Sequence, residues 1–222
     1  DEAKEWLEDA TSRMYDVISK SNFQQEIFEC YHDLIAFGTA CLMIEEDQDD
    51  VLNFSARHIK EIYIQENKKG YVDTIYRRFK MPSQAAADKF GVENISKDLI
   101  NKARKDPFQD VQLVHVIKPR LDFDPKKEDK KNMPFSSIYF EYESGHIIST
   151  GGFKESPYVI PRYLKASTET YGRSPGMNAL PDVKVLNKMV ETAMKAAAKQ
   201  VDPPLLVPDD SMLSPIRMSA GS

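Results

Sequence analysis

The spacing of hydrophobic residues changes twice along the chain, and these changes limit the folds available to it. Before Gly38, apolar residues recur at three- and four-residue steps, as on one face of an amphipathic helix. From Cys41 to Tyr163 they gather in short, partly alternating runs, which are typical of strands. A helical pattern returns from Asp182 to Lys199. This order predicts an α+β fold: two N-terminal helices, a β-rich region with a small helical insert, and a long C-terminal helix.

The first two helices are predicted to meet at Ser21-Asn22, where the apolar pattern breaks. The second helix should extend from Phe23 to Phe37 and end at Gly38, because glycine readily adopts the left-handed conformation that terminates helices. Each helix has one expected apolar stripe. The stripe residues are Trp6, Leu7, Ala10, Met14, Val17 and Ile18 in the first helix, and Ile27, Phe28, Tyr31, Leu34 and Ile35 in the second.

The β-rich region should contain strands, one clear hairpin and two short helices. The turn Asn67-Lys68-Lys69-Gly70 is expected to join a strand at Ile62 and Ile64 to another from Tyr71 to Phe79. The helical insert should extend from Ser83 to Phe90, and again from a Ser96 cap to about Arg104. The other expected strands are Cys41 to Ile44, Val111 to Ile117, Ser137 to Tyr142, His146 to Ser149, and an extended stretch near Tyr158 to Tyr163.

The last helix carries four lysines on one narrow stripe. At 100° per residue, Lys195, Lys188 and Lys199 lie about 20°, 40° and 60° from Lys184. Glu191 falls on the same stripe and is placed to pair with Lys188 or Lys195. Pro181 fits either the first turn of this helix or a kink in a helix that already begins at Pro175. The stripe itself is either a solvated face or a basic line that faces a polyanion.

Motifs that suggest an enzyme or a metal site do not withstand inspection. The segment Gly172 to Gly176 matches the nucleophile-elbow pattern G-x-S-x-G, but Pro175 has no N–H to contribute to an oxyanion hole. Ser174 fits better as a helix cap, with Pro175 as the first helical residue. The acidic turn from Asp47 to Asp50 lacks the glycine and glutamate of a calcium loop. The four histidines lack metal-ligand spacing, and no phosphate-binding loop is found. We therefore predict no catalysis, no cofactor and no metal.

Net charge, cysteine content and hydrophobicity limit the binding partners and the cellular compartment expected for the chain. The net charge is −5, so the chain by itself should not bind DNA tightly, since such affinity comes largely from neutralised phosphates. Cys30 and Cys41 are expected to be buried thiols in a reducing compartment. No apolar run approaches the ~20 residues that span a bilayer, so no membrane partner is expected.

A series of short motifs resembles the podovirus-type bacteriophage head-to-tail connecting, or portal, proteins. Each motif is weak alone, but their order across nearly the whole chain is specific. The series comprises Ser21-Asn22-Phe23, Asp33-Leu34, Phe37 to Ala40, Tyr76 to Phe79, His115 to Arg120, Met133 to Phe135, Gly151 to Phe153, Pro157-Tyr158, Pro161 to Tyr163, Tyr171 to Gly176, Leu180 to Asp182, Leu186-Asn187 and Asp202 to Leu205.

The resemblance implies a structural subunit of a bacteriophage or prophage. Such subunits form a homo-oligomeric ring, typically a dodecamer, at one capsid vertex of the virion. A terminase ATPase packages double-stranded DNA through the ring, the tail attaches below it, and the genome is later ejected through it. The implied partners are other copies of the chain, the terminase large subunit, tail adaptors, capsid and scaffolding proteins, and DNA held non-specifically. Assembly would take place in the host bacterial cytoplasm.

The resemblance also implies a division of the chain. Residues 1–170 correspond to the portal wing and 171–200 to the first stem helix. Residues 201–222 begin a clip region that is truncated here, so we expect the ring to need residues beyond this chain. Lys184, Lys188, Lys195 and Lys199 become candidates to face the DNA channel. Asp209, Asp210 and Arg217 become candidates to contact terminase through the clip. The alternative is a cytosolic, non-catalytic interaction module without DNA contact.

Overall fold

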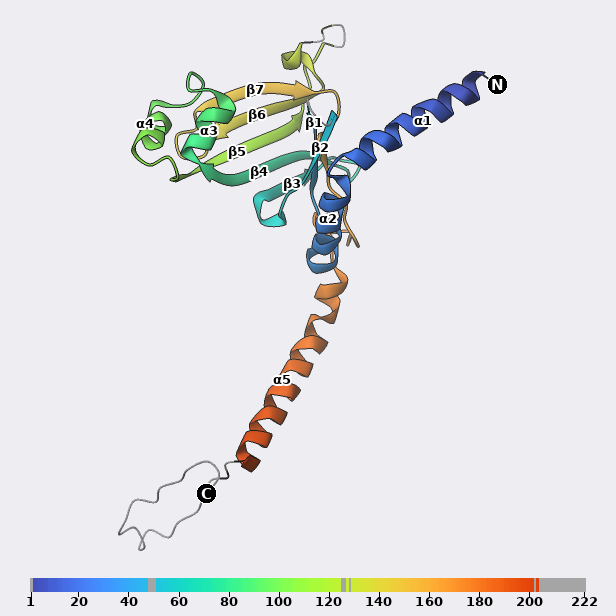
Figure 1. The fold of residues 1–222 in the computed structure, drawn as a ribbon, viewed down its shortest axis with the longest axis vertical. Helices are drawn as coiled ribbons and strands as arrows, with labels where there is room; N and C mark the ends of the chain where they lie inside the picture. The colour runs from blue at the N-terminus through green and yellow to red at the C-terminus, as the bar shows by residue number, and fades with distance from the viewer. Residues whose placement is uncertain (1, 48–50, 125–126, 128, 202, 204–222) are drawn as a thin grey trace, which may run out of the picture. The chain divides into compact units, whose positions relative to one another are not determined.

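A computed structural model describes residues 2–47, 51–124, 127, 129–201 and 203. The chain divides into two compact units, Asp1–Met177 and Asn178–Ser222. We call the first unit the body (Figure 1).

The helices are α1 (Glu2–Lys20), α2 (Phe23–Phe37), α3 (Ser83–Phe90), α4 (Lys97–Lys105) and α5 (Pro175–Val201), with 3₁₀ turns η1 (Ile59–Glu61) and η2 (Lys130–Asn132). The strands are β1 (Leu42–Asp47), β2 (Val51–Ala56), β3 (Ile62–Glu66), β4 (Val72–Pro82), β5 (Asp110–Pro119), β6 (Phe135–Glu141), β7 (Ile147–Phe153) and β8 (Tyr158–Val159).

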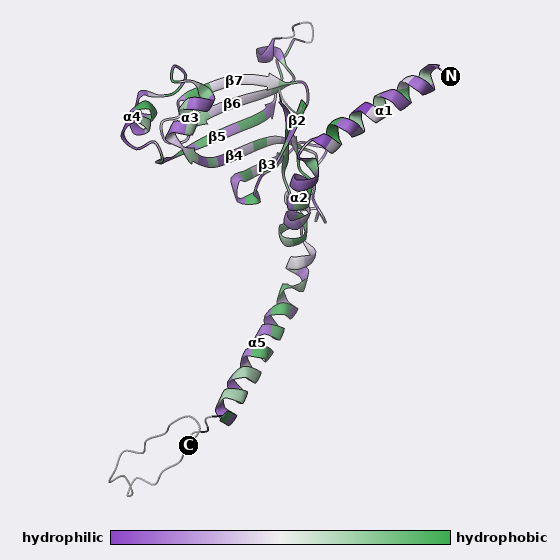
Figure 2. Cartoon of the chain, in the orientation of Figure 1, coloured by the Kyte–Doolittle hydropathy of each residue, from purple (hydrophilic) through white to green (hydrophobic). Residues whose placement is uncertain are grey.

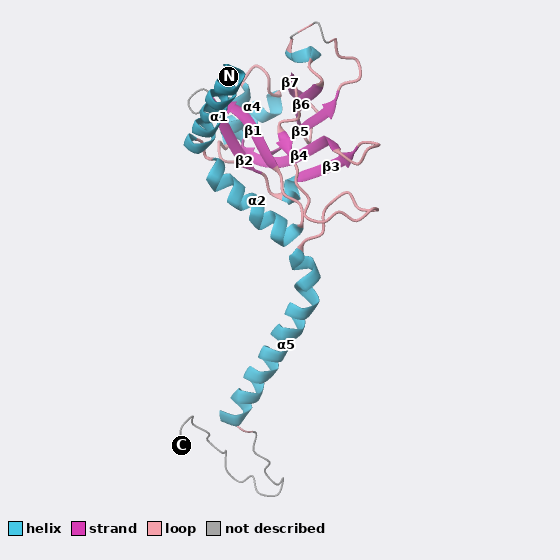
Figure 3. Ribbon diagram, turned by 90° about the vertical axis from the view of Figure 1, so that its right-hand side faces the viewer, coloured by secondary structure: helices cyan, strands magenta, loops and turns pink. Residues whose placement is uncertain are grey.

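The body contains two antiparallel sheets, and the predicted α+β class is confirmed. The large sheet has the order β3-β4-β5-β6-β7, in which every strand pairs with its neighbour in sequence. The small sheet has the order β2-β1-β8. The sequence analysis missed β2, whose residues Val51–Ala56 are mostly only partly buried and show no clean alternation. Figure 3 shows both sheets with α2 beside the small one.

The alternation of side chains along β1 builds a three-layer body. Leu42 packs with Cys30 of α2, so this face of the small sheet is covered by the helix. Met43 points the other way and packs with Ile75 and Ile117 of the large sheet. The layers are therefore α2, then the small sheet, then the large sheet, because successive strand residues face opposite sides.

The helical insert covers the same face of the large sheet as the small sheet does. Phe79 of β4 packs with Leu99 of α4, and Ile75, four residues earlier on the strand, packs with the small sheet. Residues four apart on a strand share a face. Ser96 caps α4 as predicted, since its Oγ accepts a hydrogen bond from the N–H of Leu99 at 3.2 Å.

The boundaries of the first two helices were predicted correctly, but their stripes are not covered as expected. Gly38 ends α2 with φ 77°, in the left-handed region. Within α2, Ile27 and Leu34 pack against the small sheet, whereas Phe28, Tyr31 and Ile35 are exposed. The two sets lie on different faces of the helix, so its apolar residues do not form the single buried stripe that the sequence suggested.

Helix α5 begins at Pro175 and contains Pro181, which decides between the two readings of that proline. Pro181 is an internal residue and lacks the N–H that would bond the preceding turn.

Both predicted buried thiols are confirmed: Cys30 and Cys41 are free and buried. Burial raises the pKa of Cys30 to about 11 and that of Cys41 to about 12, so both thiols are unreactive at neutral pH.

Candidate functional site

The start of α5 is fixed to the body by the segment that resembles a nucleophile elbow. The Oγ of Ser174 accepts a hydrogen bond from the N–H of Met177 at 2.9 Å, and it donates one to the carbonyl of Ala36 at 2.8 Å. The serine is fully buried. Its hydroxyl therefore caps α5 and holds the helix start to the end of α2, as the sequence predicted for the cap.

Two glycines bring this segment against the end of α2. A Cβ on Gly172 would lie 2.2 Å from the carbonyl oxygen of Gly38, and one on Gly38 would lie 2.5 Å from the carbonyl carbon of Arg173. The hydroxyl of the buried Thr39 accepts a hydrogen bond from the N–H of Gly172 at 2.8 Å. Such backbone contact is possible only without side chains, so both glycines are structurally required.

The four lysines of the predicted stripe all lie on α5, and two of them share one carboxylate. Glu191 accepts hydrogen bonds from Lys188 at 3.0 Å and from Lys195 at 2.5 Å. These bonds, that from Lys195 above all, lower the pKa of Glu191, so it stays ionised. Lys184 and Lys199 form no ion pair with any residue in the described part of the chain. The stripe thus carries three excess positive charges.

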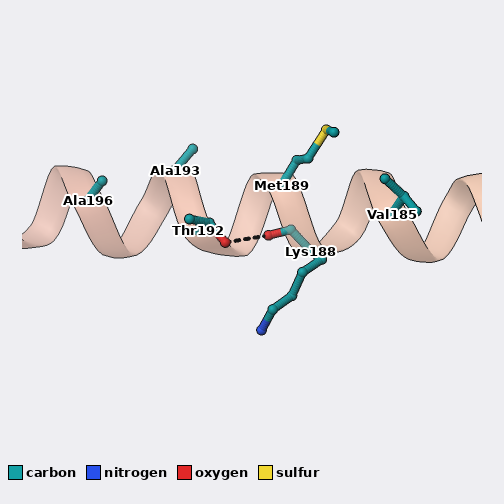
Figure 4. A pocket seen from close by; sticks show the side chains of 6 residues that line it. All are labelled: Val185, Lys188, Met189, Thr192, Ala193 and Ala196. Carbon is teal, nitrogen blue, oxygen red and sulfur yellow. Dashed lines mark hydrogen bonds between the residues drawn. The ribbon is translucent and has the colours of Figure 1, made fainter.

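The rest of α5 is a wide apolar arc. Its residues span about 180° of the helix, from Val185 through Ala193 to Met194. Exposed fractions along the arc extend from 46% at Val183 to 70% at Met194. Figure 4 shows part of it, with Val185, Met189, Ala193 and Ala196 on one side of the helix and the Lys188 side chain pointing away from them. Figure 2 shows hydrophobic and hydrophilic residues along the whole helix.

The body contains a buried polar cluster that the sequence analysis did not single out. Nδ1 of His115 lies 2.9 Å from the hydroxyl of Tyr158, and Nε2 lies 2.9 Å from Oγ of Ser137. The imidazole also stacks on Tyr139, with the ring centres 3.8 Å apart. Burial lowers the pKa of His115 to about 3, so the ring is neutral. The signal was present in β5, where His115 occupies an inward-facing position between Leu113 and Ile117.

This cluster has the chemistry of a structural joint between the sheets. His115 and Ser137 belong to the large sheet, whereas Tyr158 belongs to β8 of the small sheet. Both ring nitrogens of His115 are engaged in these hydrogen bonds. The hydroxyl of Ser174, the serine of the elbow-like segment, bonds Ala36 and Met177 and not the histidine. Desolvation by burial also raises the pKa of Tyr158, which keeps its phenol protonated.

Comparison with known proteins identifies a family for this chain. The family model for the bacteriophage head to tail connecting protein matches residues 1–222. The chain belongs to this family. It is 32% identical over 209 residues to the portal protein of Salmonella phage epsilon15, and 30% identical over 210 residues to the probable portal protein of Bordetella phage BPP-1. Both alignments cover 92% of this chain and 38% of the relative, so the chain spans well under half the length of either.

The remaining candidate residues of this head-to-tail connecting protein lie beyond the described part. Asp209, Asp210 and Arg217, proposed from sequence as clip contacts, fall outside the described residues, as do Gln48 to Asp50 of the acidic turn. Within the described residues, no cluster of histidine, cysteine and acidic side chains is arranged to hold a metal ion. In the same residues, no helix combines the length and apolar character needed to cross a bilayer.

Proposed function

We propose that this chain is the wing and first stem helix of a bacteriophage portal subunit. Residues 1–170 form the wing, 171–200 the stem helix and 201–222 the beginning of the clip. The intact protein forms a ring at one capsid vertex of the virion, and DNA is packaged and later ejected through its channel. Membership of the head-to-tail connecting family and the names of both relatives support this proposal.

The exposed apolar arc of α5 is the observation that carries the proposal. A helix that stays alone in water presents apolar residues over a narrow face at most, because each exposed apolar side chain forgoes the free energy of burial. Here about half of the circumference is apolar and exposed from Val183 to Met194. Such a helix needs neighbours on two sides. Copies arranged by head-to-tail contacts in a closed ring provide them.

The lysine stripe fits the side of α5 that the neighbours leave free. We propose that Lys184, Lys188, Lys195 and Lys199 face the DNA in the channel. One stripe with three excess charges binds DNA weakly, and the chain as a whole carries −5. Repeated around a ring, the stripes hold counterions and phosphates without a fixed register. That is the requirement for a passage through which DNA slides.

The remaining partners follow from the same proposal. The terminase large subunit and the tail adaptors bind at the clip, where Asp209, Asp210 and Arg217 are the candidate contacts. Capsid and scaffolding proteins surround the wing, and assembly takes place in the host cytoplasm before the ring enters the virion. The subunit is structural and catalyses no reaction.

Electron microscopy of the full-length protein tests the ring. We expect closed rings, dodecamers in the simplest case, with a channel wide enough for duplex DNA. A full-length protein that stays monomeric or dimeric at high concentration would refute the proposal. That result would favour the alternative of an interaction module without DNA contact.

Replacement of the four stripe lysines by glutamine in the full-length protein tests their role. We expect the wing to remain folded and the ring to form, while DNA packaging or genome retention changes. A matched control replaces four exposed lysines of the body, Lys60, Lys97, Lys105 and Lys154, in the same way. If both quadruple variants package DNA like the unchanged protein, the stripe is only a solvated face of the helix.

A further inference from the structure

Helix α1 presents an apolar stripe that its own chain leaves uncovered. Trp6, Leu7 and Met14 have exposed fractions of 68%, 57% and 66%, and none of the residues of α1 is buried. The six stripe residues fall within about 120° of the helix circumference. Of the six, Ala10, Val17 and Ile18 are partly covered. A stripe of this width on a surface helix normally packs against another element.

The junction after α1 attaches the start of α2 to the small sheet. The side chain of Asn22 donates a hydrogen bond to the carbonyl of Phe54 at 2.7 Å and accepts one from its N–H at 2.9 Å. Glu26, in the first turn of α2, accepts a hydrogen bond from the N–H of Ala56 at 2.6 Å. The start of α2 is thereby attached to β2, and α1 contacts only α2 and β2 substantially (Figure 1). The exposure of the stripe therefore follows from the bonded junction between α1 and α2.

One face of the large sheet lies outside the three hydrophobic clusters of the described part of the body. Its inward residues, such as Ile75 and Leu113, pack with the insert and the small sheet. The residues between them point outward. The outward row across four strands is Tyr63, Tyr76, Val116 and Ile138, and the next row includes Arg78, Val114 and Phe140. We call this surface the open face. Tyr63 is 47% exposed and Tyr76 39% exposed, whereas the shorter Val116 of the first row and Val114 of the second are buried.

The charges of the two surfaces are complementary. The first nine described residues of α1 contain Glu2, Glu5, Glu8 and Asp9 against Lys4, an excess of three negative charges. The strands of the open face contribute Arg78, Lys80 and Lys118 against Asp110, an excess of two positive charges. An acidic amphipathic helix and a basic sheet face with apolar and aromatic rows suit one another in charge and in polarity.

The layer order prevents these surfaces from meeting within one chain. The small sheet lies on the inward face of the large sheet, α2 lies on the far side of the small sheet, and α1 follows α2. The open face points in the opposite direction. Two different, complementary surfaces on opposite sides of one body produce a head-to-tail contact, and repetition of such a contact closes a ring when the rotation permits.

We propose that α1 of one subunit lies across the open face of the next subunit, with Trp6 as its central apolar contact. This inference rests on the ring of the proposed function and names the surfaces through which the wings join. The occupant of the open face is therefore a second copy of this chain.

Photo-cross-linking in the full-length ring tests the contact directly. Trp6 is replaced by the photoreactive p-benzoylphenylalanine in rings assembled from a mixture of isotopically light and heavy copies. Tyr15 is the matched control, because it is equally exposed at 68% and lies on the opposite side of α1, about 180° from Trp6. We expect the probe at position 6 to form light–heavy cross-links to peptides of β4, β5 and β6, and the probe at position 15 to form none there.

The alternative occupants give different results. Cross-links from position 6 only within its own copy, only to residues beyond 222, or to DNA overturn the inference, and so does the absence of any cross-link. In each of these cases an intact ring leaves the proposed function standing. Failure of the unchanged protein to form a ring removes the proposed function itself.

The protein concentration at which substituted proteins assemble into rings gives a second test of the contact. Because Trp6 is exposed in the isolated chain, Trp6→Ala leaves the fold intact. We expect it to raise the protein concentration needed for ring assembly by about 30-fold, the effect of losing a central interface residue. Tyr15→Ala should leave that concentration unchanged. Equal assembly by the two variants and the unchanged protein overturns the inference.

Discussion

The body and α5 use similar residues in opposite ways. In the cores of the three clusters of the body, leucine, isoleucine and valine side chains are almost completely buried. In α5, residues of the same types are about half exposed, and none is buried. The three clusters thus provide their own partners for burial, whereas the apolar residues of α5, like those of the α1 stripe, stay exposed in the single chain. Burial within a chain stabilises its fold, whereas apolar surface kept for assembly adds nothing to the stability of the single chain.

The largest expected effect contrasts one leucine of each region. Leu113 is fully buried, and Leu186 is 59% exposed. Leu113→Ala should lower the free energy of unfolding by about 2–5 kcal/mol, because it leaves a cavity among packed side chains. Leu186→Ala should change it by less than about 0.5 kcal/mol. Chemical denaturation of the chain measures both values, and equal losses would contradict the distinction between the regions.

The backbone contact between Gly38 and the start of α5 is the next test. Gly38→Ala should cost about 3 kcal/mol, since a methyl group adds left-handed strain and collides with the backbone of Arg173. Gly145→Ala is the matched control: Gly145 also has a positive φ, 68°, but no atom lies within 4 Å of its added Cβ. Its cost should be about 1 kcal/mol. Thermal denaturation measures the loss of stability in both variants. Equal losses would mean that the backbone near Gly38 moves to accept the methyl group without added strain.

The buried histidine predicts that the stability of the body depends on pH. The pKa of His115 is about 3 in the folded chain and 6.5 when exposed, so the unfolded chain binds the extra proton first. This contribution is complete above pH 6.5 and is lost as the pH falls toward 3. Between pH 7 and pH 5 the histidine should account for about 2 kcal/mol of lost stability.

Denaturation of His115→Gln at pH 7 and at pH 5 isolates the contribution of the histidine to the pH dependence of stability. The variant should be less stable at pH 7, because it loses part of the hydrogen bonding to Tyr158 and Ser137. Its stability should then fall by about 2 kcal/mol less than that of the unchanged chain between pH 7 and pH 5. An unchanged pH dependence would show that the imidazole is not the group responsible.

The smallest expected effect lies where the two regions join. Ser174→Ala removes the cap of α5 and the bond to Ala36, and it should cost about 1 kcal/mol. Thr11→Ala is a suitable control, since Thr11 is exposed and its hydroxyl donates a hydrogen bond to the carbonyl of Leu7 within α1. Its cost should stay within about 0.5 kcal/mol. A loss at Ser174 no larger than at Thr11 would mean that the helix start does not depend on its cap.

The predictions from sequence were most accurate where local chemistry decides the structure. The end of α2 at Gly38, the hairpin at Asn67 to Gly70 and the Ser96 cap were correct, because each depends on residues within one turn. Helix α2 also begins after Asn22 as predicted, but the side chain of Asn22 bonds Phe54 of β2 and does not cap the helix. The stripe of four lysines and its pairing with Glu191 also followed from helix geometry alone. Strand β2 was missed because its partner β1, and not its own pattern, makes it a strand.

The sequence by itself determined most of the elements, the end of α2, the cap of α4 and the family to which the chain belongs. Those features depend on periodicity, on capping residues and on motif order, which all lie along the chain. The tertiary structure alone decided which apolar faces are covered. It buried Ile27 and exposed Phe28, brought His115 to Tyr158, and left the stripe of α1 uncovered. The sequence cannot distinguish these faces, because burial depends on contacts between residues that are distant along the chain.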